Sequence, residues 1–173
     1  MIALDRRVES WIVAHRIAPL DRLFVALSWV GAYGLVWLAL GAAVALVLRR
    51  PRVFVLVLAA DLAAYVLSSG LKELVRRPRP DPAHRLREAA GFSFPSGHAT
   101  IAFACCVVLS FAVPRLWPVF AILACAIAFS RLYLGVHYPL DALGGAALGV
   151  AVATALLLPG RVRRRWRELP PPG

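Results

Sequence analysis

The amino-acid sequence predicts an all-α protein, a polytopic membrane bundle of about five transmembrane helices preceded by an amphipathic interfacial helix. Of the 173 residues, 61% are hydrophobic, and the mean hydropathy is +0.73. These values are far too apolar for an ordinary soluble domain of this length. Long apolar runs recur along the chain, and arginines and prolines separate them. The length suits a single domain.

The first two predicted elements differ in hydrophobic pattern. In residues 4–17, Leu4, Val8 and Trp11 recur at helical spacing among charged residues, so we expect an amphipathic helix. Such a helix could lie in the membrane interface or pack against the rest of the domain, and the pattern leaves both open. Residues 23–48 then form an apolar run without a charge, long enough to span a bilayer with some tilt.

The second predicted span, residues 53–71, contains Asp61 as its only charge. Its helix is expected to continue to Val75. A carboxylate in hydrocarbon is costly without a partner. Tyr65, one helical turn further on, is the candidate partner for Asp61.

The C-terminal half contains three further apolar segments. Residues 98–113 and 118–130 are short, and they reach membrane-spanning length only if the helices begin near Ser96 and Arg115. A four-span alternative makes 98–130 one re-entrant hairpin. Residues 139–158 form the last span, opened by a proline at a first-turn position. We expect residues 1–160 to form one membrane domain and residues 161–173 to be a basic, proline-ended tail.

The net charge of +11 comes from 20 Lys and Arg residues against 9 Asp and Glu. Such a chain favours anionic lipid headgroups or phosphorylated substrates. Nucleic acid is excluded as the main partner, because most of the surface must face hydrocarbon. No Cys/His cluster has metal-binding spacing, so no metal or cofactor is expected. No pattern in the residues defines an oligomeric state.

Three polar blocks interrupt the apolar runs, at residues 72–80, 95–98 and 130–141. The first lies where the second span ends, and the second lies where the third span begins. The third block joins the fourth span to the fifth. This topology brings all three blocks to the same membrane face, where polar residues near spans are usually functional.

The residue types in these blocks suit phosphate chemistry. Lys72, Arg79 and Arg131 can bind a dianionic phosphoryl group. Ser96 and Gly97 precede a helix, so free backbone N–H groups there can point at an anion.

Two histidines and a carboxylate in the blocks can divide the catalytic work. His137 lies four residues before Asp141, which can orient its ring for attack on phosphorus. His98, at a helix N-terminus, can protonate the leaving oxygen and then activate water.

The blocks resemble the signature of the type 2 phosphatidic acid phosphatase superfamily: K-x6-RP, then PSGH, then SR-x5-H-x3-D. Every specified position is matched in order between residues 72 and 141. The resemblance implies a helical membrane bundle that uses no metal. In this sequence it implies that His137 is the nucleophile that becomes phosphohistidine, His98 the general acid and Asp141 the orienting carboxylate. It assigns phosphate binding to Lys72, Arg79, Ser96, Gly97 and Arg131.

Several functions fit this resemblance. The lead is hydrolysis of a polyprenyl diphosphate, followed by phosphatidic acid or phosphatidylglycerophosphate. A lipid transporter on the same bundle would need no nucleophile, and a vanadate-dependent haloperoxidase would be soluble and larger. The resemblance favours a bacterial inner membrane with the site facing outward.

The arginines outside the motif have two readings. They could hold a second phosphate or a lipid headgroup, but a solvated loop contacting anionic lipid is favoured. These residues are Arg76, Arg77, Arg85 and Arg87. His15 and His84 are expected at the surface.

Overall fold

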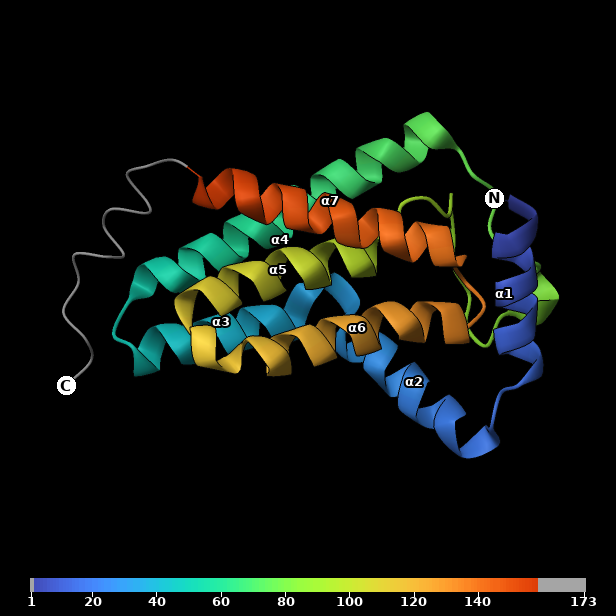
Figure 1. Ribbon diagram of the computed structural model, residues 1–173, viewed down its shortest axis with the longest axis horizontal. Helices are drawn as coiled ribbons and strands as arrows, with labels where there is room; N and C mark the ends of the chain where they lie inside the picture. The colour runs from blue at the N-terminus through green and yellow to red at the C-terminus, as the bar shows by residue number, and fades with distance from the viewer. Residues whose placement is uncertain (1, 159–173) are drawn as a thin grey trace.

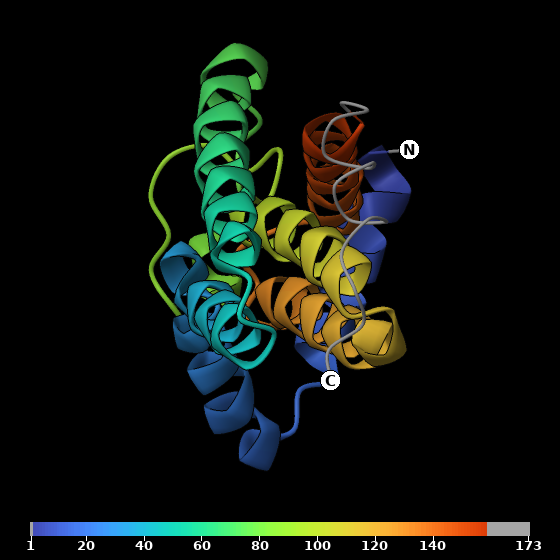
Figure 2. The same cartoon turned by 90° about the vertical axis from the view of Figure 1, so that its left-hand side faces the viewer.

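The computed structural model describes residues 2–158, and every regular element in that range is helical (Figure 1). The helices are α1 (Ile2–Ala14), α2 (Ala18–Val30), η1 (Ala32–Gly34), α3 (Leu35–Val47), α4 (Pro51–Val75), η2 (Pro82–His84), α5 (Gly97–Ala112), η3 (Pro114–Leu116), α6 (Trp117–Tyr133) and α7 (Pro139–Leu157). α5 packs against α4, α6 and α7 and forms the centre of the bundle (Figure 2). The predicted tail, residues 161–173, lies outside the described residues.

The apolar run 23–48, expected as one span, is divided into two helices. α2 and α3 meet at η1 with a bend of 62°. Gly34 adopts a left-handed conformation (φ 67°), and a Cβ there would lie 1.9 Å from Asp61 Oδ1. The glycine therefore allows both the bend and the close approach of α4. Asp61 Oδ1 has no hydrogen-bond partner among the described residues, so the expected pairing with Tyr65 is not formed.

The remaining predicted spans are helical near their expected ends. α4 extends to Val75, where Arg76 closes it with a left-handed residue. Among residues 2–158, three helical segments are long and apolar enough to cross a membrane, and there are four if the bent pair α2–α3 counts as one span. α5 is apolar but has 16 residues, which is short for a full span. The chain is therefore a multi-span membrane protein, and a fifth span through α5 stays a prediction.

Glycines on α7 set its distance from α5. A Cβ on Gly145 would lie 2.5 Å from the carbonyl oxygen of Ser96, and one on Gly149 would lie 2.3 Å from that of Thr100. Small residues four apart allow two membrane helices to approach closely. This contact brings the start of α5, with His98, beside the start of α7, with Asp141.

α1 runs crosswise over the end of the bundle (Figure 1) and packs against α6 and α7. It buries Asp5 and Glu9, each 3% exposed, together with Ile12, whereas Leu4 and Trp11 are more than 60% exposed. The helix therefore turns its carboxylates inward and an apolar stripe outward. Both expected alternatives describe part of this arrangement, because α1 is packed on the domain and also presents an apolar face to its surroundings.

Candidate active site

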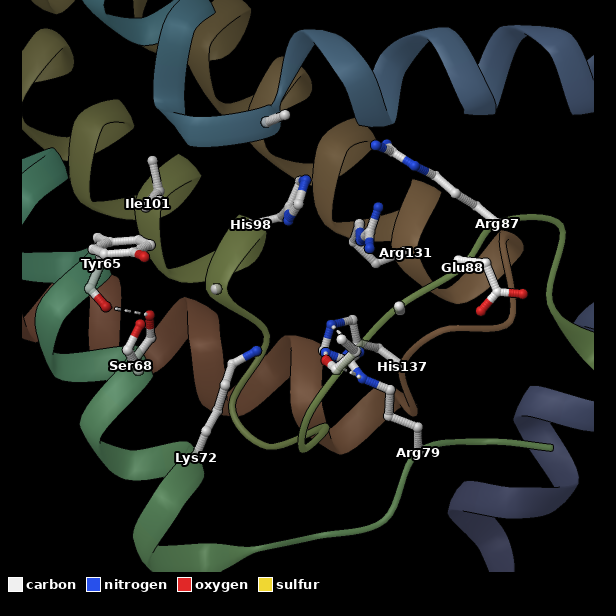
Figure 3. A pocket seen from close by; sticks show the side chains of 15 residues that line it. Tyr65, Ser68, Lys72, Arg79, Arg87, Glu88, His98, Ile101, Arg131 and His137 are labelled. Carbon is white, nitrogen blue, oxygen red and sulfur yellow. Dashed lines mark hydrogen bonds between the residues drawn. The ribbon is translucent and has the colours of Figure 1, made fainter. Parts of the chain in front are cut away.

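The three polar blocks meet at one end of the bundle, around a cavity of about 540 Å³ (Figure 3). This size lies within the range of small-molecule sites. Six of the eight residues expected to act in the site line the cavity: Lys72, Arg79, Gly97, His98, Arg131 and His137. The other two, Ser96 and Asp141, are completely buried. The structure therefore brings together the residues that the sequence pattern selected.

The contacts of His137 define its tautomer. Arg79 Nη1 lies 3.2 Å from His137 Nε2. A guanidinium can only donate, so Nε2 carries a lone pair and the proton of the neutral ring lies on Nδ1. Nδ1 in turn faces Asp141 Oδ2 at 3.4 Å, in an alignment that does not form a hydrogen bond. The neutral ring thus directs an unprotonated nitrogen toward the cavity cations.

The electrostatic surroundings keep His137 neutral. Burial lowers the pKa of His137 well below its ordinary value, and the positive charges of Arg79, Arg131 and Lys72 lower it further. An imidazole must be neutral to attack phosphorus. The same cations that would bind a phosphate therefore keep the ring in its nucleophilic form.

Asp141 lies behind His137 and is held from two sides. Oδ1 accepts a hydrogen bond from Arg77 Nη1 at 2.7 Å, and Oδ2 accepts one from the backbone N–H of Tyr138 at 2.8 Å. The Arg77 guanidinium also stacks over the Tyr138 ring at 4.4 Å. These contacts hold the carboxylate in place beside the imidazole.

Ser28 of α2 connects three side chains of the site. Its carbonyl oxygen lies 3.3 Å from His98 Nε2, and its hydroxyl accepts hydrogen bonds from Arg131 and, at 3.1 Å, from Arg87. Because the carbonyl only accepts, His98 carries a proton on Nε2. Sequence analysis did not select Ser28. A hydroxyl within an apolar run was the only signal.

Ser96 contributes differently from the expectation. Its backbone N–H donates to the Asp141 carbonyl at 2.9 Å, so it is not free to bind an anion. Its hydroxyl, however, is buried without a hydrogen-bond partner among the described residues, as is Arg131 Nε. Buried polar groups are normally paired. Of these two groups, the guanidinium belongs to a residue that lines the cavity, so a ligand that accepts hydrogen bonds would suit it.

The arginines outside the motif have separate positions. Arg87 lines the cavity and stacks on Trp29, with 3.8 Å to the ring centroid. Arg77 bonds to Asp141, which corrects the view that it belongs to a solvated loop. Arg85 donates to the carbonyl of Pro80, and Arg76 to that of Glu73.

The two histidines expected at the surface differ. His15 is exposed and stacks on Trp11. His84 is only partly exposed and lies 3.1 Å from the buried Glu9. Neither histidine lines the cavity.

Most of the charged side chains that line the cavity are cationic. Within residues 2–158, no group of three or more His, Cys, Asp or Glu side chains is placed to hold a metal ion. Lys72, Arg79 and Arg131 line the cavity, and their charges would suit a phosphoryl group, since Arg forks match phosphate oxygens well.

A helical membrane bundle with this cationic, histidine-bearing cavity defines a membrane phosphatase of lipid phosphates. The family model described as the PAP2 superfamily matches residues 52–165, and the chain belongs to this superfamily.

The named proteins that this chain resembles are phosphatases as well. The chain is 36% identical over 146 residues to decaprenylphosphoryl-5-phosphoribose phosphatase of Mycobacterium tuberculosis, covering 82% of this chain and 81% of the relative. It is 32% identical over 141 residues to undecaprenyl-diphosphatase of Sulfolobus acidocaldarius, covering 78% and 68%. The transmembrane PAP2 type phosphatidylglycerolphosphate phosphatase of Bacillus subtilis has a similar structure, with a TM-score of 0.81, 27% identity and coverage of 96% and 88%. The chain is a hydrolase of lipid phosphates, which excludes the non-enzymatic transporter.

Proposed function

We propose that this protein removes the terminal phosphate of a polyprenyl diphosphate through a phosphohistidine formed at His137. The observation that carries the proposal is the neutral His137 ring, whose Nε2 faces a cavity lined by four cationic side chains. Named relatives that act on polyprenyl-linked phosphates support this substrate class.

In the first step, His137 Nε2 attacks phosphorus and the bond to the leaving oxygen breaks. His98, protonated to an imidazolium when the anionic substrate binds, gives one proton to that oxygen and becomes neutral. Arg79, Lys72 and Arg131 stabilise the charge on the equatorial phosphoryl oxygens. The Nδ1–H of His137 turns toward Asp141, which stabilises the positive charge that develops on the ring.

In the second step, water attacks the phosphohistidine. His98, now without that proton, accepts one from the water. The phosphorus–nitrogen bond breaks, inorganic phosphate leaves, and both imidazoles return to their starting forms.

The two flanks of the cavity favour a lipid diphosphate (Figure 3). On one side, Tyr65 of α4 and Ile101 of α5 lie together next to Ser68 (Figure 3) and offer apolar contacts for a lipid chain. On the other flank, Arg87 shares Ser28 with His98. This places a cation on the side of the leaving group. A leaving group that is itself a phosphate matches that cation.

Phosphatidic acid and phosphatidylglycerophosphate are the alternative substrates. The structural similarity to the Bacillus subtilis phosphatase named above supports the second of these. A phosphatidic acid leaving group is a neutral alcohol and offers no partner for Arg87.

We further propose a bacterial inner membrane location with the cavity on the extracytoplasmic side. The similarity to bacterial lipid phosphatases supports the location. Polyprenyl diphosphates released outside the cytoplasmic leaflet would reach such a site without crossing the membrane.

The proposed nucleophile is tested by His137→Ala with undecaprenyl diphosphate in detergent, with a chelator present. We expect phosphate release to fall by about 1,000-fold or more, because the attacking atom is removed. Radiolabelled substrate should label the wild-type protein transiently and leave the variant unlabelled. Retained turnover by a folded variant would refute the assignment.

The substrate proposal is tested with Arg87→Gln against undecaprenyl diphosphate and phosphatidic acid. We expect diphosphate turnover to fall by about 10-fold or more, as for loss of a charged hydrogen bond, and phosphatidic acid turnover to stay close to wild type. Arg85→Gln, in the same loop but outside the cavity, is the matched control. Equal losses on both substrates would contradict a role in binding the second phosphate.

A further inference from the structure

A chain of charged contacts connects the N-terminal helix to the site. Arg77 bridges two buried carboxylates, with Nη1 donating to Asp141 and Nη2 donating to Asp5 of α1. Asp5 is 3% exposed and Asp141 is completely buried. Burial opposes the charge of Arg77, but its hydrogen bond to Asp5 and the charge of Asp141 raise the pKa of Arg77. The positive charge of Arg77 is thus held between the two carboxylates.

Asp5 makes a second contact that bears on the same carboxylate. Its Oδ1 accepts a hydrogen bond from the backbone N–H of Leu140 at 2.9 Å. Leu140 precedes Asp141 in the first turn of α7. Asp5 thus holds both the guanidinium that binds Asp141 and the backbone that carries it.

We propose that Asp5 is a positioning residue for the reaction, acting through Arg77 on Asp141 and hence on His137. This inference rests on the proposed function of His137. Asp5 lies outside the three polar blocks, and the family model begins only at residue 52.

The bridge has a definite electrostatic effect. Asp5, Arg77 and Asp141 together carry one net negative charge directly behind the His137 ring. That charge stabilises the imidazole as it becomes positive during attack, whereas the ground-state substrate lies on the other side of the ring. Loss of Asp5 should therefore lower kcat and leave KM nearly unchanged.

The decisive substitution is Asp5→Asn, because the amide oxygen can still accept from Leu140 while the charge facing Arg77 is lost. We expect kcat to fall by about 10- to 100-fold, the range found when outer partners of functional side chains are removed. Glu9→Gln is the matched control, since Glu9 is equally buried on the same face of α1 but pairs with His84. It should retain wild-type kcat.

A double-mutant cycle separates this role from a general effect on folding. In an Arg77→Gln background, Asp5→Asn should cause no further loss of kcat, because its connection to Asp141 is already broken. A full additional loss would overturn the proposal, and so would wild-type kcat in the single variant. If Asp5→Asn does not fold, Arg77→Lys is used instead, because one ammonium cannot replace the fork between two carboxylates. Wild-type kcat for Arg77→Lys would overturn the proposal.

Failure of the positioning role of Asp5 can be distinguished from failure of the proposed function. Turnover retained by His137→Ala would refute the nucleophile whatever Asp5 does. An inactive His137→Ala variant together with a fully active Asp5→Asn variant would refute only the positioning role.

Discussion

At the scale of residues, the site depends on which atoms carry protons. Arg79 donates toward His137 Nε2, and this contact leaves Nδ1 as the protonated nitrogen facing Asp141. A bound phosphate would draw the Arg79 fork onto its oxygens and free the Nε2 lone pair. The cation that contacts the proposed nucleophile in the free protein would thus also bind the substrate.

The depressed pKa of His137 predicts a pH dependence of stability. The unfolded chain takes up a proton at this residue below about pH 6.5, whereas the folded protein does not. Stability therefore falls as the pH drops below about 6.5, by up to about 1.4 kcal/mol per pH unit, and is independent of this group at higher pH.

Thermal unfolding in detergent at pH 7.5 and pH 5 measures this effect. The fall in Tm should be smaller in His137→Gln, which has no titrating group at the position, than in wild type. His15→Gln serves as the control, since His15 is exposed, and it should keep the wild-type slope. Identical slopes in all three proteins would contradict a neutral, buried His137.

At the scale of elements, the contact between α5 and α7 decides whether the site is assembled. His98 and Ser96 lie at the start of α5, and Asp141 lies in the first turn of α7. The hydrogen bond from Ser96 N–H to the Asp141 carbonyl joins the two starts directly. Glycines at 145 and 149 allow this approach, since a side chain at either would meet backbone atoms of α5.

Gly149→Val should destabilise the protein by about 1–3 kcal/mol through overpacking, because its Cβ would lie 2.3 Å from the carbonyl oxygen of Thr100. Activity should fall with it as α5 and α7 separate. Gly70→Ala in α4 is the matched control, where a Cβ would meet no atom of the described chain within 4 Å. That change should be neutral or stabilising by up to about 1 kcal/mol. Unfolding in detergent measures the change in stability of both variants.

The elements could be predicted from the sequence to different degrees. Apolar length located α4, α6 and α7 well, since a span needs about 20 apolar residues. The division of the apolar run 23–48 into α2 and α3 was not predicted. Gly34 permits the bend where Asp61 of α4 packs against it, and this contact is visible only in the tertiary structure. Likewise, the spacing of apolar residues in α1 predicted a helix but not which face is buried. That face is decided by Arg77, far along the chain, which binds Asp5.

At the scale of the whole molecule, α1 crosses the end of the bundle where α6 ends and α7 begins (Figure 1). His137, which lines the cavity, lies between these two helices. The exposed apolar stripe on α1 suits the membrane interface. Counting arginines on the two faces of the predicted topology does not determine the orientation, because both faces carry similar numbers. The sidedness proposal therefore needs a direct measurement.

Cysteine labelling in intact cells provides that measurement, in a background without the three native cysteines. Two exposed residues are each replaced by cysteine. Ala83 lies in the loop near the cavity, and Arg49 lies between α3 and α4 at the opposite end of the bundle. A membrane-impermeant maleimide should label Ala83→Cys and not Arg49→Cys. The reverse pattern would show that the cavity faces the cytoplasm. Labelling of lysed cells confirms that both positions react.

The sequence by itself determined the class of fold and six of the residues that line the cavity, and it indicated the chemistry they suit. It could do so because the motif spacings are local, and because membrane topology decides which loops share a face. Only the tertiary structure decided the contacts of Arg77 and Arg87, which are alike in sequence, and those of Ser28 and Asp5. These depend on contacts between segments far apart in the chain, where packing and burial, rather than spacing, select the partner of each charge.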